Sequence, residues 1–422
     1  MQTTMAVSLS SSITLPCGLK FPNRLVKAAM AEGLASGEHL PNEKHVLAYS
    51  QWAEGGWGCI LTGNVHVDNM HIGAPKDIFV KPQISNETRQ AWKLWAAACQ
   101  RGGTPAIVQI CHPGRQSAAG DRSFFEKTIA PSAVSFSIGP GLFDWAVRAL
   151  VFGTPREMTI RDIEKVVNQF ATTAKLAADS GFSGIELHAA HGYLLAQFLS
   201  PQSNLRTDEY GGTPARRAKI VIDIIKAIRK VVPASFCVGL KMNSVDVQES
   251  DDMSESLEQF RLIANEKIDF LEISGGTYED PRMFLGGSPA ADEQAVTRGS
   301  PREAFFLEFA QAVRQKFPDV VLIVTGGFRT RRGMEAALKS NSCDLVGLGR
   351  PAAAIPHLPK DLILNDEVSD EDAHMNFAKV KVPWLAKMIP LKLVGMGVES
   401  SYYGSQIRVM GNGEKPKPPP RV

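Results

Sequence analysis

The feature that most constrains the fold is a regular alternation of short runs of β-strand type with longer amphipathic stretches. The eight runs predicted to be strands are Leu25–Met30, Cys59–Thr62, Ala106–Ile110, Gly184–His188, Phe236–Met242, Phe270–Ser274, Val320–Thr325 and Asp344–Gly349. The stretches predicted to be helices are Glu43–Glu54, Glu87–Arg101, Ile160–Ser180, Ala215–Val231, Ser254–Lys267, Arg302–Phe317 and Arg332–Ser340. Strands that alternate with helices form right-handed βαβ units and a parallel sheet, and eight such strands complete a (β/α)8 TIM barrel, an α/β fold.

An open, doubly wound sheet is the main alternative. That fold normally carries a Gly-rich turn after its first strand and an acidic residue about 20 positions later. Nothing near Met30 offers this pattern, so the barrel is favoured. The stretch Ile160–Ser180 shows the helical periodicity most clearly, and Thr159 with Asp162 is typical of a helix N-terminus.

The composition excludes several classes of function. Charged residues make up 21% of the 422 residues and the formal net charge is +2, so nothing favours a nucleic acid, an anionic membrane surface or an acidic polymer as partner. The 6 cysteines are scattered without C-x-x-C spacing, which disfavours a zinc ribbon, an iron–sulfur cluster or a disulfide scaffold. The N-terminus lacks the features of a secretory signal, and we expect free thiols and a cytoplasmic location.

Two long connections and a C-terminal extension complete the expected organisation. Pro113–Met158 contains the apolar cluster Phe143, Trp145, Leu150, Val151 and Phe152, and Gly275–Gly299 contains Tyr278 and Phe284. Long insertions after barrel strands usually cover the active site. Val382–Val398 is apolar, but at 17 residues with two prolines and two lysines it predicts a packing or interface helix and no membrane span. We expect a barrel over residues 1–364, a helical extension over 365–410 and a disordered tail over 411–422.

The residues at the C-terminal ends of the predicted strands, and those just after them, become neighbours at the mouth of a barrel. The set comprises Ala28, Ala29, Met30, Ala31, Asn64, Gln109, His188, His191, Tyr193, Lys241, Gly326, Gly327, Gly349 and Arg350. Glycines and an arginine at the last two strands favour a phosphate, because they present backbone N–H groups and a guanidinium. Gln109 can donate and accept hydrogen bonds at a polar ring, and Lys241 could stabilise negative charge there.

The stretch Gly184–Gly212 carries the most chemistry. His188 and His191 could together polarise a carbonyl oxygen, although a pair of buried structural histidines is the plainer alternative. A metal site is disfavoured, because a third ligand and an H-E-x-x-H motif are both absent from the sequence here. Tyr193 could act as a general acid, since an ordinary tyrosine keeps its proton near neutral pH; the alternative is a packing role.

These residues carry a family resemblance. His188-Ala-Ala-His191-Gly-Tyr193, Phe198-Leu-Ser-Pro201 and Asn204-Leu-Arg206-Thr-Asp208-Glu-Tyr210-Gly-Gly212 are its most specific motifs. Asn23-Arg24, His112-Pro-Gly-Arg115, Ala130-Pro131-Ser132 and Gly349-Arg350 support them. From about Pro16 to Ile355 the chain resembles the old yellow enzyme family of FMN-dependent NADH:flavin oxidoreductases and ene-reductases.

The resemblance implies a function and assigns roles. FMN would be bound and NADH or NADPH would be its transient reductant, and the C=C bond of an α,β-unsaturated carbonyl compound would be reduced. Hydride would come from flavin N5, His188 and His191 would hold the carbonyl oxygen, and Tyr193 would give the proton. Gln109 and Lys241 would lie at the flavin pyrimidine, residues 28–31 along the ring, and Gly326, Gly327, Gly349 and Arg350 at the phosphate.

Two positions depart from the family pattern. Ala29 stands where the family usually has Pro, and Ala31 stands where Thr or Cys usually tunes the flavin. The flavin should lose one hydrogen bond at Ala31, worth about 1 kcal/mol. A flavin-dependent isomerase or dehydrogenase, and a flavin-binding protein without turnover, stay open as alternative functions. The sequence also leaves open the physiological substrate, the choice between NADH and NADPH, and whether the chain forms a homo-oligomer.

Overall fold

The computed structural model describes residues 7–123, 126–136, 152–243, 250–274, 301–378, 380 and 392–421. Eight parallel strands close into a barrel in the order β3-β13-β12-β11-β10-β9-β6-β4, with β3 paired to β4. The strands are β3 (Leu25–Lys27), β4 (Cys59–His66), β6 (Ala106–Cys111), β9 (Gly184–Ala189), β10 (Cys237–Asn243), β11 (Phe270–Ser274), β12 (Leu322–Thr325) and β13 (Leu345–Leu348). The predicted (β/α)8 barrel is therefore confirmed, with each predicted strand found at its place.

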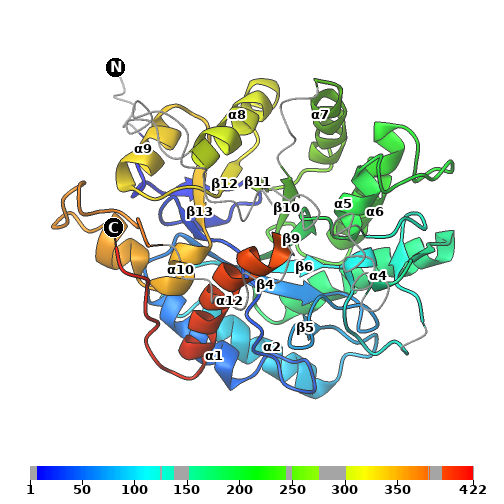
Figure 1. Ribbon diagram of the computed structural model, residues 1–422, viewed down its shortest axis with the longest axis horizontal. Helices are drawn as coiled ribbons and strands as arrows, with labels where there is room; N and C mark the ends of the chain where they lie inside the picture. The colour runs from blue at the N-terminus through cyan, green and yellow to red at the C-terminus, as the bar shows by residue number, and fades with distance from the viewer. Residues whose placement is uncertain are drawn as a thin grey trace.

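Helices surround the barrel (Figure 1). They are α1 (Glu43–Ala53), α2 (Asn86–Cys99), α4 (Ile160–Asp179), α5 (Leu194–Leu199), α6 (Pro214–Arg229), α7 (Ser250–Ala264), α8 (Pro301–Lys316), α9 (Arg331–Lys339), α10 (Arg350–Ala354) and α12 (Lys392–Gly411). None of the helices in the described part of the chain is long and apolar enough to cross a membrane.

Local sequence explains where these helices begin. The Thr159 side chain accepts a hydrogen bond from Asp162 N while the Asp162 carboxylate accepts one from Thr159 N, so both ends of a capping box are present at the start of α4. α6 begins with Thr213 as its cap and Pro214 in its first turn, where a missing N–H costs nothing. The expected start of the long helix at Thr159 is confirmed.

Two hydrophobic cores lie on the two sides of the strands. The larger one fills the space between the strands and the helices. The smaller one lies inside the barrel and includes the first residues of several strands, among them Cys59, Cys237 and Phe270. A short N-terminal hairpin, β1 (Ile13–Thr14) with β2 (Lys20–Phe21), adds buried Leu15 and Phe21 to this inner core. The hairpin therefore covers the N-terminal end of the barrel with apolar side chains.

Three smaller strand features went unpredicted. β4 runs four residues beyond its predicted end and shifts register against β6 between Leu61 and Asn64. β5 (Ile78–Phe79) adds a ninth strand beside β4. β7 (Ile129–Ala130) pairs with β8 (Arg156–Glu157) in a separate two-stranded parallel sheet. A shift of register re-aims side chains, and here it carries Asn64 to the position beside Gln109.

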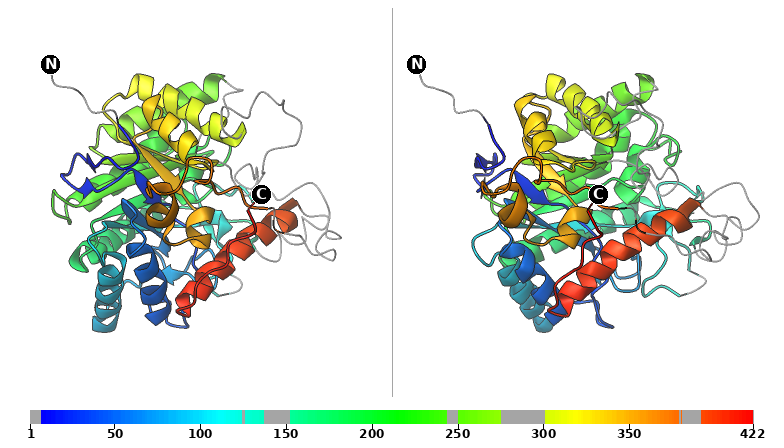
Figure 2. Two further views of the ribbon diagram at one scale, coloured as in Figure 1. Left: turned by 90° about the vertical axis from the view of Figure 1, so that its left-hand side faces the viewer. Right: turned by 60° about the vertical axis from the view of Figure 1, so that its left-hand side comes forward.

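The C-terminal part lies against the barrel. α12 packs beside α1 and α10, and Figure 2 shows its whole length along that side of the molecule. Residues 412–421, expected to be a disordered tail, make defined contacts: Lys417 N donates to Gln406 Oε1 at 2.8 Å and Ala378 N donates to Pro420 O at 2.8 Å. The division of the chain into domains stays a prediction.

Some sequence-based expectations fall outside the described residues. They include the apolar cluster of Phe143, Trp145, Leu150, Val151 and Phe152, of which Phe152 alone is described, and the whole connection Gly275–Gly299. The predicted segment Val382–Val398 is also outside, except for its last part, which forms the start of α12.

Candidate active site

A cavity of about 450 Å³ opens at the C-terminal ends of the strands. Every residue predicted to bind a cofactor lines it, and so do His188 and His191, whereas Tyr193 is not a lining residue. The remaining lining residues are Ser274, Thr325, Phe328, Arg329, Gly347, Leu348, Pro351, Ser400 and Ser401. This volume is within the usual range for a small-molecule site.

One wall of the cavity is the extended segment from Ala28 to Ala31. Ala28 N donates to Leu348 O at 3.0 Å, which fixes the start of the segment to β13. The Glu32 carboxylate holds its other end, because Oε1 accepts hydrogen bonds from Gly63 N at 2.9 Å and from the Tyr49 hydroxyl. The small side chains therefore lie on a backbone that is anchored at both ends.

A buried lysine stands behind that wall. Lys27 is fully buried, its Nζ donates to Leu61 O at 2.8 Å and lies 4.3 Å from the centre of the Trp52 ring. Burial lowers the pKa of Lys27 to about 8, with the Glu32 carboxylate opposing the shift. Burial also raises the pKa of Glu32. Sequence analysis did not single out Lys27 or Glu32, because Lys27 lies inside a predicted strand.

At the inner end of the cavity lies the polar centre, defined here as Gln109, Glu186, Lys241 and Glu272. Lys241 Nζ lies 2.8 Å from Glu272 Oε1, and Gln109 Nε2 donates to Glu186 Oε2 at 2.6 Å. All of these side chains are buried. Gln109 and Lys241 were predicted to face a ligand, whereas Glu186 and Glu272 were missed because they read as strand interior.

The polar centre retains a proton. Burial and the neighbouring Glu272 carboxylate raise the pKa of Glu186 well above its usual value. Burial alone would raise the pKa of Glu272 as well, but the Lys241 ammonium outweighs that effect and lowers it. Burial alone would lower the pKa of Lys241, yet Glu272 and Glu186 raise it. Near neutral pH, Lys241 and Glu272 therefore form a charged pair beside a neutral Glu186.

His188 and His191 are joined in series. Ala190 N donates to His188 Nδ1 at 3.3 Å, so the neutral His188 ring carries its proton on Nε2, 3.3 Å from His191 Nδ1. Burial lowers the pKa of His188 well below its usual value, which keeps the ring neutral. In its neutral form His191 then carries its proton on Nε2, which lies 3.3 Å from Ser274 Oγ.

His191 is held in an uncommon backbone conformation. Its φ is 58°, in the left-handed region that non-glycine residues seldom occupy. Its N–H donates to Asn243 Oδ1 at 3.0 Å, which offsets part of the strain. Strain of this kind persists at sites where the side-chain direction matters. Here it points the imidazole of His191 toward the cavity.

Tyr193 lies next to the histidine pair. Only 6% of its surface is exposed, its ring centre is 4.8 Å from that of His188, and its hydroxyl oxygen accepts a hydrogen bond from Asn64 Nδ2 at 3.3 Å. Because Asn64 lines the cavity, Tyr193 reaches it through this contact. The structure thus brings together the three residues predicted to act in catalysis.

The other end of the cavity is called the phosphate end and comprises Gly326, Gly327, Gly349 and Arg350. Gly326 and Gly327 have φ of 133° and 83°, backbone conformations that residues with a side chain rarely adopt. Glycine is therefore needed in this turn. Arg350 Nη1 donates to Glu399 Oε2 of α12 at 2.6 Å. Ser400 and Ser401 follow on the same helix, and nothing in the sequence had linked them to the barrel.

The donor set fits FMN. Its ring has polar edges that need both donors and acceptors, and the polar centre supplies an amide and an ammonium group. Its phosphate needs backbone N–H groups and a cation, which the phosphate end supplies. Between the two ends the wall is built of alanines and Met30, against which a flat ring can lie.

Two other groups of residues in the described part of the chain have the composition of a metal site. Asp68, His71 and His112 are buried together, but Gly114 N donates to His112 Nδ1 at 3.0 Å, which leaves the proton of neutral His112 on Nε2, the atom nearest Asp68. A protonated nitrogen cannot bind a metal ion, so His112 is not a ligand here; Asp68 Oδ2 lies 2.7 Å from His71 Nδ1, within hydrogen-bond distance, and 3.6 Å from His112 Nε2.

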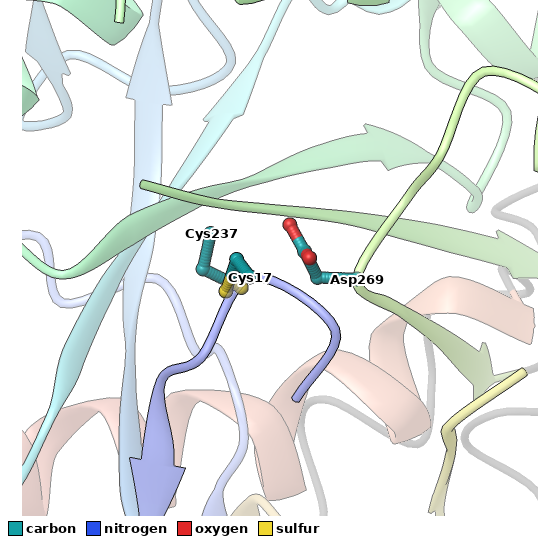
Figure 3. A group of neighbouring side chains, drawn as sticks. All are labelled: Cys17, Cys237 and Asp269. Carbon is teal, nitrogen blue, oxygen red and sulfur yellow. The ribbon is translucent and has the colours of Figure 1, made fainter. Parts of the chain in front are cut away.

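The second group is Cys17, Cys237 and Asp269 at the closed end of the barrel (Figure 3). Asp269 Oδ2 already accepts from Val238 N at 2.7 Å and from Arg229 Nη2 at 2.8 Å. The guanidinium beside this carboxylate opposes the binding of a cation. Neither group therefore changes the assignment of the cavity.

Comparisons with known proteins agree with this geometry. Residues 15–365 match the model of the NADH:flavin oxidoreductase / NADH oxidase family. The NADH-dependent flavin oxidoreductase iliE of Neonectria sp. (strain DH2) is 50% identical over 93% of this chain, which spans only 52% of that relative. The NADH-dependent flavin oxidoreductase iccE of Talaromyces variabilis is 48% identical over 95% of this chain and 98% of its own length.

A solved structure shows the same fold. The old yellow enzyme homologue from Zymomonas mobilis superimposes with a TM-score of 0.67 at 20% identity, over 86% of this chain and 94% of its own.

Proposed function

The chain belongs to the NADH:flavin oxidoreductase / NADH oxidase family, the FMN-dependent oxidoreductases of the old yellow enzyme type, and from that premise we propose that it is an ene-reductase. It uses NADH or NADPH to reduce the C=C bond of an α,β-unsaturated carbonyl compound. The observation that carries the proposal is the junction of His188, His191, Asn64 and Tyr193 at one side of a cavity that fits FMN.

FMN would be held by the polar centre, the wall from Ala28 to Ala31 and the phosphate end. When bound, it supplies at N5 the hydride taken from the nicotinamide. The Lys241 ammonium, fixed by Glu272, favours negative charge at its end of the cavity. Neutral Glu186 adds no opposing charge there, which is why retention of its proton matters.

The histidines have different roles in this proposal. His191 donates its Nε2 hydrogen to the carbonyl oxygen of the substrate, in place of Ser274. His188 fixes which nitrogen of His191 carries that hydrogen, since it donates to Nδ1. A donor aimed at the carbonyl oxygen stabilises the negative charge that develops there as the β carbon accepts hydride.

Tyr193 supplies the proton to the α carbon. Asn64 Nδ2 donates to its hydroxyl oxygen and holds the phenol at the edge of the cavity. A phenol held at this place can give its proton to carbon as a general acid. The proton given up returns from solvent once the product has left.

Anaerobic stopped-flow spectroscopy tests the proposal in two half-reactions. NADH or NADPH should bleach the flavin absorption of the holoenzyme, and an enone such as cyclohexenone should restore it. His191→Asn should weaken enone binding while the flavin reduction rate stays unchanged. For a Tyr193→Phe variant, Tyr210→Phe is the matched control, because the Tyr210 hydroxyl donates a hydrogen bond to Asp223 and lines no part of the cavity.

Two outcomes would redirect the proposal. Failure of both nucleotides to reduce the flavin would refute nucleotide-driven reduction and favour the isomerase or dehydrogenase alternative. Reduction without reoxidation by any enone would refute alkene reduction. The cytoplasmic location and a small-molecule enone as partner stay predictions.

A further inference from the structure

α12 is a part of the cavity that the family match does not include. The match ends at residue 365, whereas α12 spans Lys392–Gly411. Nevertheless Ser400 and Ser401 line the cavity, and Glu399 pairs with Arg350 at the phosphate end. A segment outside the common barrel therefore touches the place where the cofactor phosphate is expected.

α12 is firmly anchored where it leaves the cavity. Tyr403, Ile407 and Met410, one helical turn apart, are buried in the outer core. Beyond the helix the chain turns back, and the Tyr402 hydroxyl donates to Lys417 O at 2.6 Å. Both contacts fix the rotation of the helix about its axis, so the direction of residues 399–401 is set by packing and not by a ligand.

The Glu399 contact uses one edge of the Arg350 guanidinium. Nη1 donates to the carboxylate at 2.6 Å, and within the described residues the other N–H groups of this side chain have no protein acceptor. Arginine presents its donors in a rigid planar fork, so a partner on one nitrogen orients the remaining ones. A carboxylate is an unfavourable neighbour for a phosphate by charge alone, which argues that Glu399 is kept here for orientation.

We propose that α12 completes the phosphate end: Ser400 and Ser401 bind the phosphate of FMN through their hydroxyl groups, and Glu399 is a positioning residue that aims Arg350 at it. The proposal rests on the flavin site described above and extends it to residues beyond the common barrel. Hydroxyl donors suit this role, because they add hydrogen bonds to an anion without adding charge.

The test separates the phosphate from the rest of the flavin. The full-length protein, first freed of flavin, is dialysed to equilibrium against a concentration series of FMN or of riboflavin, which lacks the phosphate, and bound flavin is measured by absorbance. Ser400→Ala combined with Ser401→Ala should raise the Kd of FMN about tenfold, since hydrogen bonds to a charged group are the stronger kind. The Kd of riboflavin should change less than about twofold.

Matched variants make the result specific. Ser405→Ala lies on the same helix, where its hydroxyl donates to Tyr402 O, and should leave both constants unchanged. Ser400→Thr with Ser401→Thr keeps the hydroxyl groups and should retain most of the FMN affinity. Glu399→Gln keeps the shape but weakens the grip on Arg350, and should raise the Kd of FMN several-fold with riboflavin unaffected.

The outcomes are distinct. An equal rise of both constants would place Ser400 and Ser401 at the ring or ribityl chain and overturn the proposal. No change in either constant would also overturn it. Tighter FMN binding by Glu399→Gln would show that its charge outweighs its orienting effect and would refute the positioning role. If the wild-type protein bound neither flavin, the proposed function itself would fail.

Discussion

Replacing Lys27 by Met should make the protein more resistant to unfolding near neutral pH in a way that depends on pH. Burial holds the pKa of Lys27 at about 8 in the folded protein against 10.5 in the unfolded chain. Below pH 8 both states carry the charge, and the folded state bears the cost of burying it. Between pH 8 and 10.5 the unfolded state binds more protons than the folded state, so stability rises with pH.

The magnitude follows from the shift. The pKa difference from 10.5 to 8 corresponds to a loss of about 3 kcal/mol in the free energy of unfolding of wild type when Lys27 is charged. About 2 kcal/mol of this loss disappears as the pH rises from 7.5 to 9.5. The measurement stops at pH 9.5 because burial raises the pKa of Tyr49 well above 10. A tyrosine that keeps its proton in the folded state lowers stability as pH rises through 10, which is the opposite sign.

Urea unfolding of wild type and Lys27→Met at several pH values provides the assay. The free energy of unfolding of the variant minus that of wild type should be about 2 kcal/mol larger at pH 7.5 than at pH 9.5. Part of that gain is offset at every pH, because Leu61 O loses its donor, at a cost of about 1–3 kcal/mol. Lys93→Met on the exposed face of α2 is the control. A difference that does not vary with pH would refute the assignment of a charge cost to Lys27.

The remaining predictions concern the site and the thiols. Tyr193→Phe should slow alkene reduction about 10²–10⁴-fold with the rate of flavin reduction unchanged, as single-turnover kinetics would show; an unchanged rate would remove Tyr193 as the acid. Glu272→Gln should cost about 3–5 kcal/mol in urea unfolding because it leaves Lys241 buried and unpaired. Glu186→Gln should cost under about 1 kcal/mol because Glu186 is already neutral, and equal costs would contradict the shared proton. Iodoacetamide should label Cys17 first among the cysteines, because it alone is partly exposed and its hydrogen bond with Cys237 lowers its pKa. Peptide mass spectrometry would follow the order of labelling, and labelling of a buried thiol before Cys17 would contradict this prediction.

The barrel could be predicted from the sequence because the patterns that indicate its strands and helices involve residues close together in the chain. A strand such as Gly184–Ala189 is a short apolar run, and a helix such as α4 repeats its apolar residues within one turn and carries its own cap. Each pattern needs only residues a few positions apart. Alternation of the two then leaves few topologies, and the mouth of the barrel collects the residues after each strand.

Much of the site followed from that same rule. Gln109, Lys241 and His191 were placed at the cavity because they lie at or just after the C-terminal ends of strands, and the barrel closes those strand ends into one ring. The rule gives positions only. It does not say that His188 donates to His191, since that depends on a hydrogen bond from Ala190 N and on burial of the ring.

Only the tertiary structure determined the protonation of the buried carboxyl groups and the contact of α12 with the cavity. Glu186 and Glu272 lie 86 residues apart in sequence numbering and share a proton only because they meet inside the barrel, where water cannot separate them. α12 reaches the phosphate end although it begins far beyond the last strand. A pKa or a contact between distant segments depends on what lies across the barrel, and no periodicity along the chain encodes that distance. The sequence by itself determined the barrel and the residues at its mouth, and the closed fold determined which of them carry charge, which carry protons and what covers them.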